Sequence, residues 1–189
     1  MKIIAGGFFT MHKDVKKVLI NEEQIEQKCA ELGALLTDYY KDVEGPLVLV
    51  ALLKGSVPFL ARLIKYVDLD IEYDFMDVSS YEGTESTRDI RILKDLDRSI
   101  KGVNILLVED IVDTGHTIEA VIKLLRNKGA QDVKVVTLLD KPSRREANVK
   151  AEFIGFEIPN EFVIGFGLDF NEKYRQLPYI GVLKDEVYS

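Results

Sequence analysis

The stretch Asn104–Ala120, NILLVEDIVDTGHTIEA, decides the fold class. It begins with an apolar run typical of a strand buried on both faces, and two acids, Glu109 and Asp110, follow that run directly. Asp113 comes three residues later, and the small polar loop Thr114–Thr117 then opens a segment with apolar residues at helical spacing. A buried strand that turns into an amphipathic helix predicts one βα unit of a parallel sheet.

The same alternation recurs along the chain. We expect strands at 46–54, 71–81, 103–108 and 133–139, with short strands around 153–154 and 162–167. A helix is expected to begin near Asn21, with Gln24 as its capping-box partner, and others after residue 56 and at 118–127, the last one ended by Gly129. Residues 82–96 are predicted to be a mobile loop or a weak hairpin, and the segment after 167 a polar C-terminal tail. The pattern predicts an α/β fold with a mainly parallel sheet, whose ligands lie beyond the carboxyl ends of the strands.

Length, charge and cysteine content narrow the class of protein. The 189 residues suit one domain, which we expect to span 14–189 after an N-terminal extension, 1–13, that is disordered or begins at an alternative initiator, Met11. The single cysteine, Cys29, lies on an apolar helical face and favours a buried thiol in a reducing, cytoplasmic setting. A net charge of −7 argues against salt-driven binding of nucleic acid. No apolar run approaches the roughly 20 residues that would span a membrane.

The acids and the loop in the opening stretch make conflicting demands on a ligand. A Thr/Gly turn at a helix start suits phosphate, whereas carboxylates repel it. The chain lacks the Walker A pattern, and Gly165–Gly167 supplies only two of the three glycines of the dinucleotide fingerprint. A ribose 5-phosphate reconciles both features, because its phosphate can lie on the helix N-terminus while its hydroxyls reach Glu109 and Asp110. A solvated acidic loop that caps a helix is the alternative interpretation.

Two other strand ends carry weaker signals. Lys54-Gly55-Ser56 follows the first buried strand, where a glycine allows backbone amides to approach an anion, although a simple tight turn is the favoured explanation of this segment on its own. The segment Asp140–Arg145 follows the strand at 133–139 and is either a basic surface loop or part of a binding edge. On composition and spacing alone, both alternatives stay open.

Five motifs, in order, resemble those of a known family. Val108–Thr117 resembles the phosphoribosyl-diphosphate (PRPP) signature of type I phosphoribosyltransferases. The segments 52–55 (LLKG), 80–81 (SY), 139–142 (LDKP) and 156–169 (FEIPNEFVIGFGLD) are similar to those of hypoxanthine(-guanine) phosphoribosyltransferases of the short bacterial type. The resemblance runs from about Asp14 to the C-terminus. It implies a type I phosphoribosyltransferase fold, with a mainly parallel sheet flanked by helices and a small hood subdomain.

The resemblance also implies an activity and its partners. The family transfers 5-phosphoribosyl from PRPP to a 6-oxopurine with the help of Mg²⁺, which gives IMP or GMP and pyrophosphate in purine salvage. It further implies a cytoplasmic homodimer or homotetramer that binds neither nucleic acid nor membrane.

Site residues carry over position by position. The resemblance assigns Asp113 as the catalytic carboxylate at purine N7, and residues that hold the phosphoribosyl group: the ribose ligands Glu109 and Asp110, and the 5′-phosphate loop Asp113, Thr114, Gly115, His116 and Thr117. The resemblance assigns pyrophosphate binding to Lys54, Gly55, Arg145 and Arg175. The family often has a non-proline cis peptide at Lys54-Gly55. It assigns purine binding to Lys141, Phe162, Val163 and Asp169, and metal binding to Asp169, Glu109 and Asp110. Ser80 and Tyr81 are assigned to the loop that closes over the site.

The sequence alone leaves three alternative functions open. Another base, such as xanthine, adenine, uracil or orotate, is one alternative, and xanthine preference is the nearest of these. A PRPP-sensing regulator that binds nucleic acid is a second, although it should show a basic face, an added domain or loss of Asp113. An inactive scaffold is a third and would need degraded motifs. We expect the His116 ring to face solvent, His12 to play no part, and Arg88, where glycine is common, to alter the closing loop.

Overall fold

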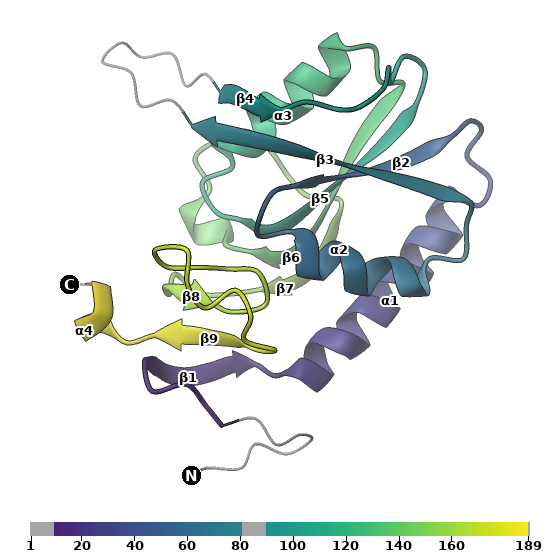
Figure 1. The fold of residues 1–189 in the computed structure, drawn as a ribbon. Helices are drawn as coiled ribbons and strands as arrows, with labels where there is room; N and C mark the ends of the chain where they lie inside the picture. Colours follow the sequence, from purple (N-terminus) through teal and green to yellow (C-terminus); the bar gives the residue numbers. More distant parts are fainter. Residues whose placement is uncertain (1–9, 81–89, 189) are drawn as a thin grey trace.

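A computed structural model describes residues 10–80 and 90–188, which form a large central sheet, a small second sheet and flanking helices (Figure 1). The strands are β1 Val15–Ile20, β2 Leu47–Leu52, β3 Ile71–Ser80, β4 Ile90–Lys94, β5 Asn104–Val112, β6 Asp132–Asp140, β7 Phe153–Glu157, β8 Val163–Ile164 and β9 Ile180–Leu183. The helices are α1 Glu22–Tyr40, α2 Val57–Leu63, α3 His116–Asn127 and α4 Asp185–Tyr188, with 3-10 turns η1 Ile64–Tyr66 and η2 Pro142–Arg144. The expected α/β fold with a mainly parallel sheet is confirmed.

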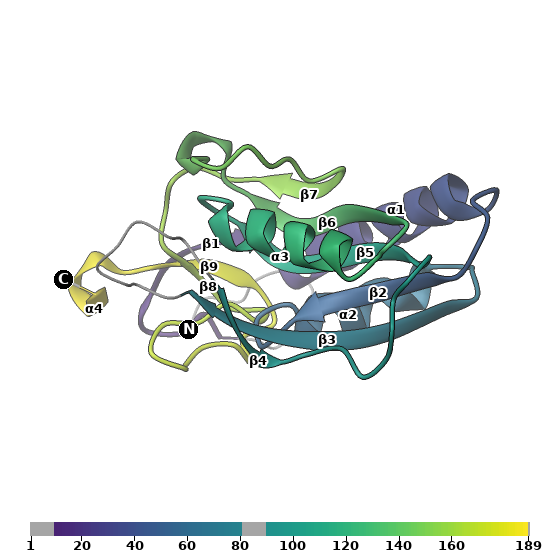
Figure 2. The same ribbon diagram turned by 90° about the horizontal axis from the view of Figure 1, so that it is seen from above.

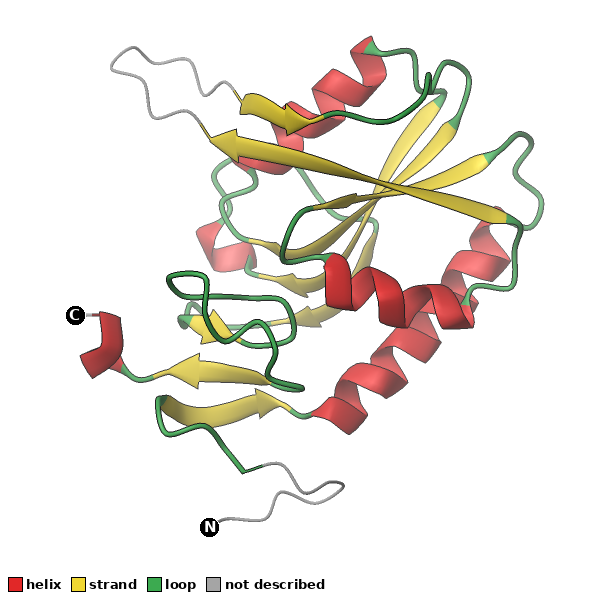
Figure 3. Cartoon of the chain, in the orientation of Figure 1, coloured by secondary structure: helices red, strands yellow, loops and turns green. Residues whose placement is uncertain are grey.

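The central sheet has the order β4-β3-β2-β5-β6-β7, and all its strands are parallel except β4, which runs antiparallel to β3. Successive side chains of a strand point to opposite faces. Leu49 of β2 accordingly packs with α1 and α2, whereas Val50 packs with α3. Figures 2 and 3 show these helices on the two sides of the sheet. Because both faces are covered, the inner strands are apolar along most of their length.

Helix α1 begins where the sequence predicted. Asn21 Oδ1 accepts a hydrogen bond from the Gln24 amide (2.8 Å), and the Gln24 side chain accepts one from the Asn21 amide (2.9 Å). This capping box satisfies two amides that the helix itself leaves without partners. Cys29 is fully buried on the apolar face of the helix, as expected, and burial raises its pKa to about 12.

The small sheet forms the hood, which we define as β1, β8, β9 and the loop 165–179. Its strand order is β1-β9-β8, antiparallel throughout, and Val15 of β1 pairs with Leu183 of β9. Strands β1 and β9 were not predicted from the sequence, and β9 falls in the segment that was predicted to be a polar tail. Both are short, and their partner lies at the other end of the chain, so no local pattern reveals the pairing. Figure 1 shows the hood beside the central sheet.

Three predicted boundaries were wrong. Strand β5 does not stop at Val108 but continues to Val112, because the ladder with β6 extends as far as the pair Val112↔Asp140. Helix α3 begins two residues before the predicted Ile118. The strand expected at 162–167 is only Val163–Ile164, because Gly165 (φ 96°) and Gly167 (φ 102°) adopt left-handed backbone conformations that end it.

Some predictions concern residues outside the described part of the chain. These are most of the N-terminal extension, Tyr81 and Arg88. Of the segment 82–96, the described part contains β4, which pairs with β3 as a hairpin would. Among the helices of residues 10–80 and 90–188, none combines the length and apolar character that crossing a membrane requires.

One close contact in the fold gives a stability prediction. Gly33 of α1 lies against the backbone and Cβ of Tyr66, so an added Cβ would overlap them. Helix propensity alone predicts that Gly33→Ala stabilises the protein by about 1 kcal/mol. Overpacking against backbone costs about 1–3 kcal/mol, so we expect Gly33→Ala to lower the free energy of unfolding, measured with urea. The exposed Ala34→Gly change in the same helix measures the propensity effect by itself, and a gain in stability for Gly33→Ala would contradict the packing argument.

Candidate active site

The acid pair, Glu109 and Asp110, lies within the extended end of β5. Glu109 is 7% exposed, and burial, followed by the neighbouring charge of Asp110, raises its pKa well above the usual value. Burial also raises the pKa of Asp110 to about 6, the charge of Asp169 acting in the same direction and that of Arg175 against it. Two carboxyl groups held in this way favour a ligand that supplies hydroxyl donors or positive charge.

The loop 114–117, as predicted from the sequence, comprises the end of the turn after β5 and the first two residues of α3. Gly115 (φ 88°) occupies the N-cap position, and it has no side chain with which to cap the first amides of the helix. The Thr114 carbonyl accepts hydrogen bonds from the Glu146 and Ala147 amides, both at 3.0 Å, which fix the loop from the side of β6. Backbone amides at a helix start, together with the helix dipole, favour an anion there.

His116 differs from expectation. Its side chain is only 21% exposed, and its Nε2 lies 2.8 Å from Glu146 Oε2. The ring therefore packs against the residues that brace the loop and does not point freely into solvent.

A charged cluster gathers where β5 and β6 end. Lys141 Nζ lies 3.4 Å from Asp113 Oδ2, and Arg144 Nε donates to Asp113 Oδ1 at 2.6 Å. Lys141 is buried, with only 8% of its side chain exposed, and its amide donates to the Val112 carbonyl at 3.0 Å. The sequence reading placed Asp113 and Lys141 in one site, and the structure brings them together. It missed Arg144, which stands in the basic loop that the sequence analysis identified.

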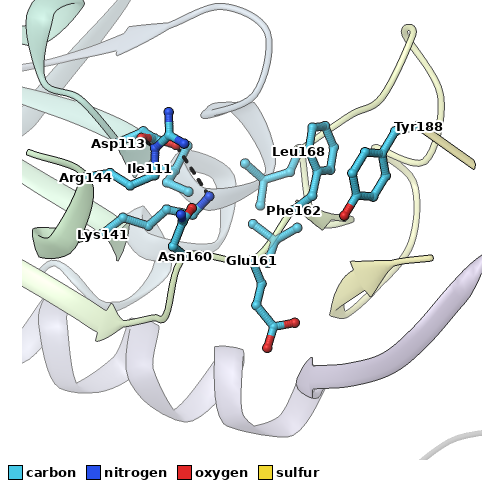
Figure 4. Close-up of a pocket in the computed structure, with 10 residues that line it drawn as sticks. Ile111, Asp113, Lys141, Arg144, Asn160, Glu161, Phe162, Leu168 and Tyr188 are labelled. Carbon is cyan, nitrogen blue, oxygen red and sulfur yellow. Dashed lines mark hydrogen bonds and ion pairs between the residues drawn. The ribbon is translucent and has the colours of Figure 1, made fainter. Parts of the chain in front are cut away.

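These side chains line a pocket of about 440 Å³ between the sheet and the hood, which we call the Lys141 pocket (Figure 4). Figure 4 shows the charged cluster at one end and the ring of Phe162 at the other. Four residues assigned to the purine or its N7 therefore line one cavity: Asp113, Lys141, Phe162 and Val163. The sequence reading missed the rest of the lining, which is Ile111, Arg144, Asn160, Glu161, Leu168 and Tyr188.

A second charged cluster lies around Arg175. Its guanidinium contacts Asp169 at 2.9 Å and Glu172 at 3.3 Å and donates to the Gly167 carbonyl at 2.8 Å. Glu172 also contacts Lys54 Nζ at 2.9 Å. Thus the structure brings Lys54, Asp169 and Arg175 close together. A non-proline cis peptide is present, but it is the Leu53–Lys54 bond, one bond before the predicted Lys54-Gly55.

Glycines allow this cluster to meet the acid pair. A Cβ at Gly55 would overlap the Asp110 carboxyl group, and a Cβ at Gly167 would overlap the Gly55 carbonyl. The hood backbone therefore contacts the turn after β2, and that turn contacts the end of β5. Such close approach requires glycine at both contact points, because any side chain there would overlap its neighbour.

Arg145 and the closing loop differ from the other assigned residues. The Arg145 guanidinium donates to the Asp140 carboxylate and to the Asp113 carbonyl, and its Cδ lies beside Gly115, so it packs against the loop 114–117. Within the described residues it makes no hydrogen bond or ion pair with the other residues assigned to pyrophosphate. Ser80 ends β3, and its side chain is outside the described part of the structure, as is all of Tyr81.

The three predicted metal ligands do not form a closed cage. Within residues 10–80 and 90–188, no three His, Cys, Asp or Glu side chains gather closely enough to hold a metal ion. Mg²⁺ usually keeps several waters and binds proteins through one or two carboxylates together with substrate phosphates. The acid pair and Asp169 fit that mode of binding, in which the ion arrives with its ligand.

The raised pKa of Asp110 gives a prediction about pH. An unfolded Asp ionises near pH 4, whereas Asp110 in the fold ionises near pH 6, so the fold loses stability as pH rises through this window. We expect Asp110→Asn to raise the free energy of unfolding at pH 8 by about 1–2 kcal/mol. This is less than the full pKa shift of Asp110 implies, because its side chain is partly exposed to solvent. Denaturant unfolding at pH 4 should show no gain. Exposed Asp70→Asn is the control, and an equal gain at both pH values would contradict the assignment.

Comparison with known proteins places this arrangement in a family. The sequence model of the phosphoribosyl transferase domain matches residues 18–171. The hypoxanthine-guanine phosphoribosyltransferase of Bacillus subtilis is 54% identical over 180 residues, covering 95% of this chain and 99% of the relative. That of Staphylococcus epidermidis is 53% identical, with the same coverage.

Solved structures agree with the sequence relatives. A crystal structure of a hypoxanthine phosphoribosyltransferase from Staphylococcus aureus superposes with a TM-score of 0.90 at 52% identity, covering 95% of this chain and 97% of that one. The Trypanosoma cruzi enzyme in complex with its product IMP gives a TM-score of 0.89 at 37% identity, covering 95% and 100%. The chain therefore belongs to the phosphoribosyl transferase family.

Proposed function

We propose that this protein is a hypoxanthine-guanine phosphoribosyltransferase of purine salvage. It transfers 5-phosphoribosyl from PRPP to hypoxanthine or guanine and releases IMP or GMP and pyrophosphate. The observation that carries the proposal is the Lys141 pocket, in which a buried lysine and Asp113 face an aromatic ring next to the loop 114–117. The names of the two bacterial relatives support the same reaction.

Base recognition would use the two ends of the pocket. Lys141 Nζ can donate to the 6-oxo group of the purine, whereas a 6-amino purine would present a donor to a donor. The purine plane would stack on Phe162, between apolar Ile111 and Leu168, which also line the pocket. Asp113 can accept the N7 proton as N9 attacks the ribose, which is the role of a general base.

The phosphoribosyl group would extend from the loop to the acid pair. Its 5′-phosphate would bind the first amides of α3 and the hydroxyls of Thr114 and Thr117. The ribose hydroxyls would donate to Glu109 and Asp110. As the anomeric C–O bond breaks, positive charge develops on the ribose, and carboxylates held in place stabilise that charge.

Pyrophosphate would take the place that Glu172 occupies between Lys54 and Arg175. Mg²⁺, when bound, offsets the charge of pyrophosphate and orients it as a leaving group. Arg145 would hold the phosphate loop in position, because it already donates a hydrogen bond to the Asp113 carbonyl. Ser80 and Tyr81 would open a segment that excludes water during transfer.

The wider assignments follow from the family. We assign residues 14–189 to one catalytic domain that works in the cytoplasm as a homodimer or homotetramer. The net charge of −7 agrees with a small-molecule transferase better than with a nucleic-acid-binding regulator.

The assignment of the pocket predicts base selectivity. With PRPP and Mg²⁺, we expect turnover of hypoxanthine or guanine but not of adenine or uracil, followed as nucleotide formation. Asp113→Asn should lower kcat about 10²–10⁴-fold because the N7 proton loses its acceptor. Lys141→Ala should raise KM for the 6-oxopurine and weaken discrimination against adenine. Exposed Lys65→Ala is the control. A folded protein that binds PRPP but turns over no base would overturn the enzyme assignment.

The open metal site predicts how Mg²⁺ binds. Because no three acids among the described residues converge on a cage, Mg²⁺ alone should shift the melting temperature little, whereas Mg²⁺ with PRPP should raise it by several degrees. Chelation with EDTA should abolish turnover without changing the circular dichroism spectrum. The proposal of a substrate-borne ion fails if Mg²⁺ binds tightly, by calorimetry, in the absence of PRPP.

A further inference from the structure

The aromatic wall of the Lys141 pocket is built from three rings. Phe162 is 39% exposed and directly precedes the buried strand β8. The ring of Tyr188 stacks on it, with centroids 5.0 Å apart and planes at 22°, and Phe170 packs against it edge-on at 5.6 Å and 89°. Phe162 and Tyr188 both line the pocket.

The two faces of the Phe162 ring have different surroundings. Figure 4 shows Asp113 and Lys141 on one side of Phe162 and Tyr188 on the other. A flat ligand held by the two charged residues would therefore meet the inner face of the phenyl ring. A ring whose outer face was bare would lose orientation more readily, because rotamer changes of exposed side chains take only picoseconds to nanoseconds. Tyr188 covers that outer face and restricts the tilt of the ring.

Contacts with Asp185 and the strands of the hood hold Tyr188 in place. Its hydroxyl donates to Asp185 Oδ1 at 2.8 Å, and Asp185 Oδ2 contacts Lys16 Nζ of β1 at 3.3 Å. The helix α4 that carries it follows β9 directly, and the Leu183 amide at the end of β9 donates to the Phe162 carbonyl at 2.9 Å. The two stacked residues therefore share one support.

We propose that Tyr188 is a positioning residue for the purine, which holds the Phe162 ring in the plane that the base requires. This inference rests on the proposed function, since it assigns the outer support of the same base site. Aromatic pairs of this geometry contribute beyond the area that they bury, which corresponds to about a two- to tenfold effect on affinity. That loss should fall on the base and its nucleotide, because the hydrogen bond and the ring contact of Tyr188 within the described residues are with Asp185 and Phe162, not with the loop 114–117 or the Arg175 cluster.

The test compares three variants of the whole chain. Tyr188→Ala should raise KM for hypoxanthine and Kd for IMP by about two- to tenfold, with KM for PRPP and the melting temperature unchanged. Tyr188→Phe keeps the ring and loses only the hydroxyl, so it should stay closer to the parent. Tyr73→Ala removes another exposed tyrosine, 56% exposed and packed edge-on against Phe75, and should leave all three constants unchanged.

A spectroscopic readout separates positioning from a general structural effect. The chain contains no tryptophan, so Phe162→Trp introduces the only indole. Its fluorescence anisotropy should fall, and quenching by acrylamide should rise, when Tyr188→Ala is added to Phe162→Trp. Unchanged anisotropy, or an equal rise in KM for PRPP and for the base, would overturn the inference. If the parent converts no purine, it is the proposed function that fails; an active parent matched by Tyr188→Ala rejects the positioning role alone.

Discussion

The burial of Glu109 and the partial burial of Asp110 at the end of β5 are the constraint on which the rest of this structure depends. Strand β5 has a parallel neighbour on each side and helices over both faces, so its side chains stand in a medium of low polarity. The strand continues past its apolar run, and Glu109 and Asp110 are therefore carried into that medium. Their carboxyl groups resist ionisation, which makes the site favour hydroxyl groups and cations over further anions.

Neighbouring elements adapt to these acids. Gly55 leaves room for the Asp110 carboxyl group, and Gly167 brings the hood backbone against the Gly55 carbonyl. Within the hood, Arg175 contacts Asp169 and the Gly167 carbonyl. A binding site for a sugar and its leaving group thus arises where three backbones touch, and side chains added at either glycine would separate them.

Local patterns in the sequence predicted much of this arrangement. The buried strands, the capping box at Asn21 and the acid–loop–helix order around Asp113 depend on neighbours within a few residues, so they are visible in the sequence. The resemblance to a family supplied Lys141 and Phe162. Arg144, the packing of His116 and the stack of Tyr188 on Phe162 escaped prediction, because each depends on a contact between segments that are distant in sequence. The direction of the Arg145 side chain likewise depends on Asp140 and on the backbone of the loop.

The pairing of β1 with β9 also sets an order of events during synthesis. Val15 leaves the ribosome early, yet its partner Leu183 is made near the end, so β1 must wait for almost the whole chain. The central strands β2 to β7 lie between the two and are all synthesised before β9. The strands that carry the acids and the loop are therefore complete before the last strand of the hood has been made. Residues such as Phe162 reach their final place only after β9 has closed the hood.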